Sequence, residues 1–107
     1  MPILYADALE EDMTRARRDN YHDEIRDGLR KCGYVTFDTA NLKHGFPDLL
    51  SVSKTGVVVL LEVKSENGKL TADEEHFFAV YNSHCHIVHD LDEALREMQF
   101  YDEREDE

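Results

Sequence analysis

The middle of the chain reads Asp48-Leu-Leu-Ser-Val-Ser53, then Lys54-Thr-Gly56, then Val57-Val-Val-Leu-Leu-Glu-Val-Lys64. A three-residue loop that ends in glycine suits a type I turn closed by a left-handed residue, so the two apolar runs are predicted to form a β-hairpin. Pairing centred on Thr55 sets Ser53 opposite Val57 and, further along, Asp48 opposite Glu62. The second run is apolar from Val57 to Leu61, as expected of a central strand that is buried on both faces.

This hairpin is expected to bring the side chains of Asp48, Glu62 and Lys64 together. Directly opposed residues point to the same face of a sheet with Cβ atoms about 5 Å apart, and Lys64 returns to that face two residues beyond Glu62. Two carboxylates this close repel each other unless a cation lies between them. The pattern therefore indicates a divalent-metal site with an ammonium group beside it. Taken singly, Asp48 after Pro47 could be a turn residue, and Glu62 with Lys64 a solvated salt bridge.

The composition is that of one globular domain. The chain has 107 residues, of which 41% are hydrophobic, and this length is enough for a single core. No apolar run approaches the length of a membrane span, and the first residues lack the basic region and long apolar segment of a signal peptide. Cys32 and Cys85 stand apart rather than in a motif, so we expect reduced, small hydrophobic residues in a cytoplasmic protein. A structural disulfide between them is the lesser alternative.

The net charge of −12 bears on any nucleic-acid partner. The tail Asp102-Glu-Arg-Glu-Asp-Glu107 accounts for −4 of this charge. Because charges more than about 8 Å apart are largely screened at physiological salt, a metal-loaded site and a local basic strip can still hold a polyanion. Loose, sequence-independent binding should be weak, since few lysines and arginines are available to release counterions. Solubility is the simplest explanation of the charge, and adaptation to high salt is a second one.

Helical and strand patterns precede the hairpin. Residues 1–18 are predicted to form an arm or a short helix. Residues 20–33 are predicted to form a helix that Asp19 or Asn20 caps and Gly33 ends. The apolar face of this helix would hold Tyr21, Ile25, Gly28, Leu29 and Cys32. A strand over residues 34–38 and an irregular loop over residues 39–47 then lead into the hairpin.

A second set of patterns follows the hairpin. A turn over residues 66–68 leads to Thr71 and Glu74, which have the spacing of a capping box. The helix that they open is predicted to bury Phe77, Phe78 and Tyr81. A short strand over residues 84–89, a helix capped at residue 90 and an acidic tail over residues 101–107 complete the chain. The order helix, three strands, helix, strand, helix predicts an α/β (α+β) fold in which helices cover both faces of a small mixed sheet.

The residues around the hairpin resemble a known family. Gly45-Phe-Pro47-Asp48, followed after fourteen residues by Glu62-Val-Lys64, is similar to the pattern of the PD-(D/E)xK nuclease superfamily. The similarity is greatest to the small VRR-NUC type found in phages and in DNA-repair enzymes, and it extends from about Arg18 to Leu95. It implies a restriction-endonuclease-like αβββαβα core over residues 19–100, in a bacterial, archaeal or phage-infected cell.

The resemblance implies roles for four side chains. Asp48 and Glu62, with the main-chain carbonyl of Val63, would hold one or two Mg²⁺ or Mn²⁺ ions, which prefer oxygen ligands. Lys64 would orient or help to deprotonate the attacking water and would offset charge in the transition state. Glu24 occupies the position of the family's first-helix glutamate and could reach toward the metals, with an exposed helix carboxylate as the alternative.

One residue departs from the family's pattern. Relatives tend to place glutamine early in the second helix, where this chain has Glu74. The capping box explains either residue, so Glu74 is not assigned to catalysis. If Glu74 faces the site, its negative charge should strengthen metal binding and weaken the approach of phosphate.

Basic and histidine side chains are candidates for contacts with DNA. Phosphate contacts position a duplex without reading its sequence, and the candidates for them are Arg15, Arg17, Arg18, Lys43 and Lys69. His44, which precedes the Pro47-Asp48 step, could touch the scissile phosphate or a base. Ordinary surface cations are the alternative for each. Four further histidines, with Cys85, could suggest a zinc site, but strand alternation turns them to different faces, so they do not converge. Surface or partly buried positions are therefore expected for His76, His84, His86 and His89.

The sequence therefore predicts an Mg²⁺- or Mn²⁺-dependent DNA endonuclease. It would select its substrate by structure, such as a Holliday junction or related branched DNA, since nothing in the chain supplies a recognition helix that reads bases. A homodimer with two active sites is expected from the resemblance and from the symmetry that most oligomers adopt. Two other functions stay open: an acidic protein on a nuclease-like fold that mimics DNA, and an assembly subunit of a larger complex.

Overall fold

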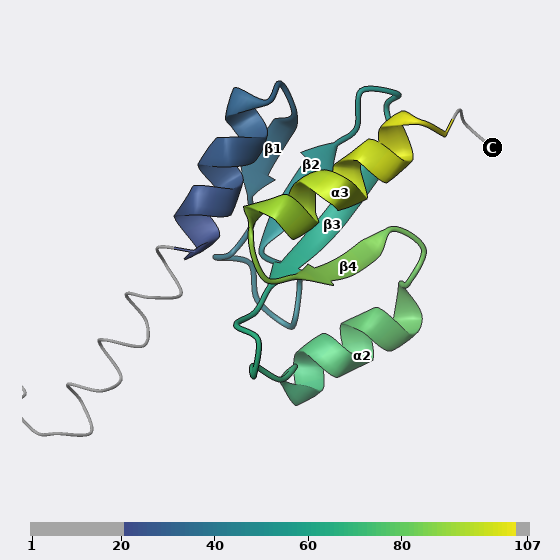
Figure 1. Cartoon of the computed structure of the whole chain (residues 1–107). Helices are drawn as coiled ribbons and strands as arrows, with labels where there is room; N and C mark the ends of the chain where they lie inside the picture. Colours follow the sequence, from purple (N-terminus) through teal and green to yellow (C-terminus); the bar gives the residue numbers. More distant parts are fainter. Residues whose placement is uncertain (1–20, 105–107) are drawn as a thin grey trace, which may run out of the picture.

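The computed structural model describes residues 21–104, and these form helices and strands in the predicted order. A helix over residues 21–31 comes first and lies beside β1 in Figure 1. It is followed by β1 (Val35–Asp38), β2 (Leu49–Val52), β3 (Val58–Val63), α2 (Ala72–Val80), β4 (Cys85–Val88) and α3 (Leu91–Asp102). The predicted α+β fold with its αβββαβα order is confirmed. The predicted caps at Asp19 or Asn20 lie outside the described residues.

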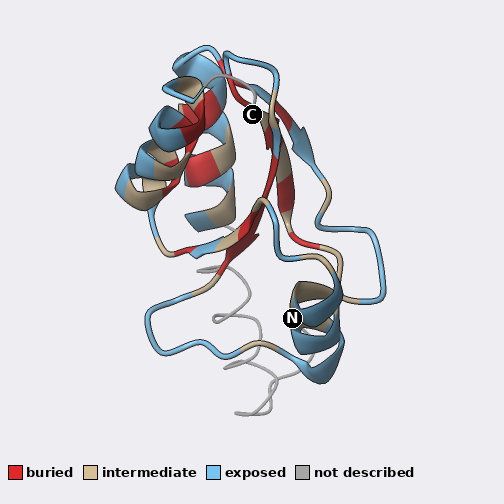
Figure 2. Ribbon diagram, turned by 90° about the vertical axis from the view of Figure 1, so that its right-hand side faces the viewer, coloured by how far each residue is buried: buried red, intermediate tan, exposed pale blue. Residues whose placement is uncertain are grey.

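The four strands form one mixed sheet in the order β1-β2-β3-β4. β1 and β2 pair antiparallel, as do β2 and β3, whereas β3 and β4 are parallel. A parallel pair needs a crossover, and α2 supplies it. Figures 1 and 2 together show the first helix and α3 side by side on one face of the sheet, with α2 on the opposite face. Both faces therefore carry helices, as predicted.

The hairpin has the predicted register. Leu49 faces Leu61 and Val52 faces Val58, and the Ser53 N–H donates to the carbonyl of Val57 at 2.8 Å. Gly56 takes the left-handed conformation, with φ of 92°, that closes a three-residue loop. Continuing this register one step beyond Leu49 and Leu61 places Asp48 opposite Glu62, on the face of the sheet that α2 covers.

The hydrophobic core lies between the sheet and the pair formed by the first helix and α3. Ile25 and Leu29 of the first helix pack with buried residues of β2, β3, β4 and α3, which are Leu49, Val59, Leu61, Val63, Val88, Ala94, Met98 and Tyr101. Burying each large aliphatic side chain stabilises the fold by about 1.5–3 kcal/mol. In β3 all residues after Val58 are buried, as expected of the central strand. The strand that carries Glu62 is thus held rigidly by packing on both sides.

Three details of packing differ from the sequence prediction. Phe77, Phe78 and Tyr81 are half-buried, because α2 covers only part of its face of the sheet and has no fully buried residue. Cys32 is exposed, because the chain leaves the helix there and Gly33 turns it toward β1 with φ of 92°. Tyr21, which was predicted to lie on the same apolar face, is 47% exposed.

The last helix also continues past the predicted domain end at residue 100. Tyr101 is buried and the carboxylate of Asp102 accepts a hydrogen bond from the main-chain N–H of Lys54 at 2.7 Å. The Tyr34 hydroxyl donates to the other oxygen of Asp102 at 2.5 Å. The first acidic residue of the predicted tail therefore belongs to the folded domain, where it ties α3 to the hairpin loop.

Candidate functional site

A polar cavity of about 480 Å³ opens where the first helix, the ends of β1 and β3, the start of β2 and the start of α2 meet. Its wall carries five carboxylates, from Asp23, Asp38, Asp48, Glu62 and Glu74. The basic side chains among its lining residues are His22 and Lys64. A cavity with this balance of charge favours a cation over a phosphate group, because each added negative charge is repelled by several carboxylates.

The hairpin brings Asp48, Glu62 and Lys64 to this cavity, as the sequence predicted. One oxygen of Asp48 accepts a hydrogen bond from the main-chain N–H of Val63 at 2.9 Å, which fixes the carboxylate across the hairpin. The Lys64 Nζ lies 3.4 Å from Oε2 of Glu62. Glu62 is only 2% exposed, and its Oε1 is a buried oxygen without a hydrogen-bond partner among the described residues. Such an orphaned oxygen is costly unless a ligand satisfies it.

Glu74 of α2 also faces the cavity. Its Oε1 lies 2.8 Å from the Lys64 Nζ and accepts a hydrogen bond from the Thr71 N–H, also at 2.8 Å. The Thr71 hydroxyl in turn accepts from the Glu74 N–H, so the predicted capping box is present. Glu74 therefore caps α2 and also forms part of the cavity wall.

Burial and like charge shift the ionisation of these groups strongly. Burial, and then the nearby charges of Asp48 and Glu74, raise the pKa of Glu62 to about 9. Burial also raises the pKa of Asp48, against the hydrogen bond from Val63. The pKa of Lys64 is raised, because its contacts with Glu74 and Glu62 outweigh the opposing effect of burial. Without a bound cation, Glu62 therefore keeps its proton near neutral pH, and a cation that binds there displaces it.

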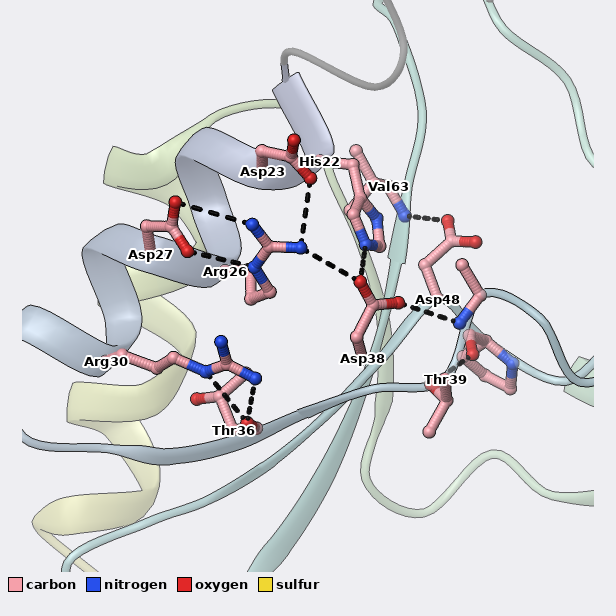
Figure 3. A network of polar contacts seen from close by, with 12 residues as sticks. His22, Asp23, Arg26, Asp27, Arg30, Thr36, Asp38, Thr39, Asp48 and Val63 are labelled. Carbon is pink, nitrogen blue, oxygen red and sulfur yellow. Dashed lines mark hydrogen bonds and ion pairs between the residues drawn. The ribbon is translucent and has the colours of Figure 1, made fainter.

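A hydrogen-bond network between the first helix and β1 forms the opposite wall (Figure 3). Nε2 of His22 lies 2.9 Å from Oδ2 of Asp38, and Nη1 of Arg26 lies 3.1 Å from the same oxygen and 3.1 Å from Asp23. The sequence analysis missed these residues. His22 and Arg26 are four residues apart and therefore share one side of the helix, which was the available signal.

The structure does not bring Glu24 to the cavity. This side chain is exposed, and the first helix contributes His22 and Asp23 to the wall instead. Successive helical residues are about 100° apart, so Glu24 points roughly 200° away from His22. Glu24 lies at one edge of the apolar stripe of the first helix. His22 lies at the opposite edge, and it is that edge which faces the cavity.

Three of the predicted DNA-contacting residues lie outside the cavity wall. Lys43, His44 and Lys69 are exposed and do not line it, and His44 has a positive φ of 67°. Arg15, Arg17 and Arg18 fall outside the described residues. Contacts from any of these side chains to DNA stay a prediction.

Three of the remaining histidines have structural partners. His84 and His86 pack their rings against Tyr101, and Nε2 of His86 lies 2.6 Å from its hydroxyl. Nδ1 of His89 lies 2.8 Å from Glu93. These three side chains are half-buried and His76 is exposed, as expected.

The carboxylate oxygens that line the cavity suit a hard divalent cation, provided that the Lys64 ammonium group moves away from Glu62. As the side chains stand, no three histidine, cysteine or acidic groups in residues 21–104 form a closed metal cluster. Oε1 of Glu62 nevertheless lacks a hydrogen-bond partner among the described residues, and one oxygen of Asp48 accepts a hydrogen bond from the Val63 N–H. The carboxylates of Asp23, Asp38 and Glu74 also line the cavity. All of these ligands are oxygens, which Mg²⁺ and Mn²⁺ prefer.

Comparison with known proteins identifies the family. No curated protein and no solved structure matches the chain. Within the described part of the chain, no helix is long and apolar enough to span a membrane. The family model of the VRR-NUC domain, however, matches residues 3–92, which include the hairpin, the cavity and most of the predicted N-terminal arm. The chain therefore belongs to the VRR-NUC family, a nuclease family of the PD-(D/E)xK type.

Proposed function

We propose that the protein is a divalent-metal-dependent DNA endonuclease whose reaction takes place in the cavity at Asp48, Glu62 and Lys64. Membership of the VRR-NUC family implies nuclease activity and binding to DNA. The observation that carries the finer proposal is the hairpin register, which delivers two carboxylates and an ammonium group to one polar cavity.

Each residue of the hairpin site has a distinct task. Asp48, Glu62 and the carbonyl of Val63 would hold Mg²⁺ or Mn²⁺. The bound ion would lower the pKa of a water molecule and stabilise charge on the phosphate. The ammonium group of Lys64, already in the cavity, would donate a hydrogen bond to the attacking water or to a phosphate oxygen and offset the charge that develops there. Glu62 would first release its proton, since its carboxylate form is the metal ligand.

The surroundings of the site support dependence on a metal. A phosphate that enters the metal-free cavity meets the carboxylates of Asp23, Asp38, Asp48 and Glu74, so it is repelled until a divalent cation neutralises part of that charge. Binding to DNA in the absence of metal is therefore expected to be weak.

The substrate and the assembly are further parts of the proposal. We expect branched DNA, such as a four-way junction, to be cut in preference to linear duplex, and we expect a homodimer to present two cavities to opposed strands. Size-exclusion chromatography with light scattering tests the dimer. A mass of one chain, 12.4 kDa, at micromolar protein would contradict it.

A cleavage panel tests the reaction. Purified protein is incubated with supercoiled, linear and four-way-junction DNA in Mg²⁺, Mn²⁺ or chelator. Wild type is compared with Asp48→Asn, Lys64→Ala and the control Glu66→Gln, which changes one charge on an exposed turn residue. We expect metal-dependent cutting that each site variant reduces by about 100-fold or more and that the control preserves. Cutting in chelator, or full activity of Asp48→Asn, would overturn the proposal.

The net charge of −12 keeps one second function open, that of a DNA mimic that blocks a DNA-binding enzyme. The same panel separates the two functions. Absence of cutting in every metal, together with inhibition of an unrelated nuclease on the same DNA, would favour the mimic.

A further inference from the structure

We propose that Glu74 is a positioning residue, which holds the ammonium group of Lys64 in the cavity. The first turn of α2 would then be part of the proposed active site. The inference rests on the proposed function for its effect on rate. The contact between Glu74 and Lys64 is present in the fold whether or not the protein cuts DNA.

Glu74 is the nearer of the two carboxylates that hold Lys64. Its Oε1 lies 2.8 Å from Nζ, against 3.4 Å for Oε2 of Glu62. Both members of the nearer pair are largely shielded, with side-chain exposures of 12% for Lys64 and 17% for Glu74. A charge-assisted hydrogen bond at this distance is among the stronger polar contacts in proteins.

Glu62 cannot hold the lysine alone once it takes part in metal binding. Its Oε2 faces Lys64 and its buried Oε1 has no partner among residues 21–104. A cation bound at Glu62 would repel the ammonium group and draw the carboxylate away from it. Glu74 stands on a different element, and the capping box holds its Oε1 next to Lys64, so this contact can persist when Glu62 turns. Lys64 can therefore stay in the cavity beside a cation.

The first turn of α2 is itself fixed to the loop that carries Asp48. The capping box with Thr71 holds the Glu74 side chain, because its Oε1 accepts the Thr71 N–H. A Cβ on Gly45 would lie 2.4 Å from the carbonyl oxygen of Asp73, so the loop and the helix are in direct backbone contact. The Phe46 and Phe77 rings pack edge to face at 5.3 Å. These contacts tie the position of Lys64 to that of Asp48 through α2.

Glu74→Gln is the decisive variant, because glutamine can also complete a capping box but lacks the negative charge. Glu75→Gln is the matched control, since Glu75 is exposed on the same helix turn and does not line the cavity. Thr71→Ala removes the cap hydroxyl and leaves the Glu74–Lys64 pair.

Steady-state cleavage in saturating Mn²⁺ separates positioning from folding. For Glu74→Gln we expect kcat to fall about tenfold or more, because a displaced catalytic group slows the chemical step. KM for DNA should stay equal or fall, because the variant removes a negative charge that repels phosphate. Thr71→Ala should lower the melting temperature and leave kcat within about twofold of wild type. Equal kcat in Glu74→Gln and Glu75→Gln would overturn the proposal, as would an equal loss of kcat in Thr71→Ala.

Amine labelling tests the contact without relying on activity. Folded, metal-free protein is acetylated briefly with acetic anhydride, and mass spectrometry compares Lys64 with the exposed Lys54 and Lys69. Relative to those references, labelling of Lys64 should rise severalfold in Glu74→Gln and stay unchanged in Glu75→Gln. If wild type cuts no DNA in any metal, the proposed function fails, and raised labelling still supports the hold of Glu74 on Lys64. Unchanged labelling in Glu74→Gln overturns the inference whatever the activity.

Discussion

Replacing Glu62 by glutamine should stabilise the metal-free protein at neutral pH and reduce the fall of its stability as pH rises. Glu62 is 2% exposed, its Oε1 has no partner among the described residues, and Asp48 lies on the same face. Burial and the Asp48 charge raise its pKa to about 9, from an ordinary value of 4.5. Glutamine has the same shape and carries no charge that must be buried.

The sign and size of the effect follow from proton binding. Between pH 4.5 and about 9 the folded protein keeps the Glu62 proton and the unfolded chain loses it, so the free energy of unfolding falls as pH rises. The fall is at most about 1.4 kcal/mol per pH unit, or roughly 2–3 kcal/mol over two units. The lowered pKa of Glu74 makes stability depend on pH only below its ordinary value of 4.5. The raised pKa of Lys64 does so only above its ordinary value of 10.5. Neither of these two groups therefore contributes a slope near neutral pH, whereas the raised pKa of Asp48 adds a fall of the same sign above its ordinary value of 3.8.

Urea unfolding in chelator at three pH values between about 5.5 and 7.5 measures this slope. Wild type should lose roughly 2 kcal/mol across the range, whereas Glu62→Gln should lose much less and should be the more stable protein at the upper end. In thermal scans each 1 kcal/mol corresponds to about 4–8 °C for a domain of this size. The exposed-site control Glu66→Gln should follow wild type. A wild-type stability that is flat or rises with pH, or a Glu62→Gln variant with an unchanged slope, would refute the reasoning.

Three further substitutions test the close contact between the Gly45 loop and α2 and the tie between Tyr34 and Asp102. Gly45→Ala should cost about 3 kcal/mol or more, because φ is 85° and the new Cβ would meet the Asp73 carbonyl oxygen at 2.4 Å. Gly56→Ala, with φ of 92° and nothing within 4 Å, should cost only about 1–2 kcal/mol; equal losses in urea unfolding would contradict this account of the α2 contact. Tyr34→Phe removes the 2.5 Å hydrogen bond to Asp102 and should cost about 1.5–3 kcal/mol by the same measurement, and an unchanged stability would show that this tie is not needed.

The parts of the fold that local sequence determines were predictable. The length of the Lys54–Gly56 loop and its final glycine set the hairpin register, and the alternation of the strands then set which side chains share a face. The capping signals at Thr71 and Asp90 are also local, and both caps are present. The convergence of Asp48, Glu62 and Lys64 followed from these local rules alone.

The parts that depend on how distant elements meet were not predictable. Glu24 and His22 flank the same apolar stripe, and only the angle of the first helix to β1 decides which of them faces the cavity. The contact of Glu74 with Lys64 depends on where α2 crosses the sheet, which no local pattern in the α2 sequence reveals. The aromatic residues of α2 were expected to be buried because they are large and apolar. A nine-residue helix at one side of the sheet, however, buries these side chains only in part.

The position of a bound divalent ion tests the central claim most directly. Crystals of the protein soaked in Mn²⁺, with diffraction recorded at the manganese absorption edge, locate the ion by its anomalous signal. We expect a peak between the Asp48 carboxylate and Oε1 of Glu62, within about 2.5 Å of both, with Lys64 still beside Glu74. A peak elsewhere in the cavity, such as between Asp23 and Asp38, or no peak beside Glu62 at saturating Mn²⁺, would contradict it.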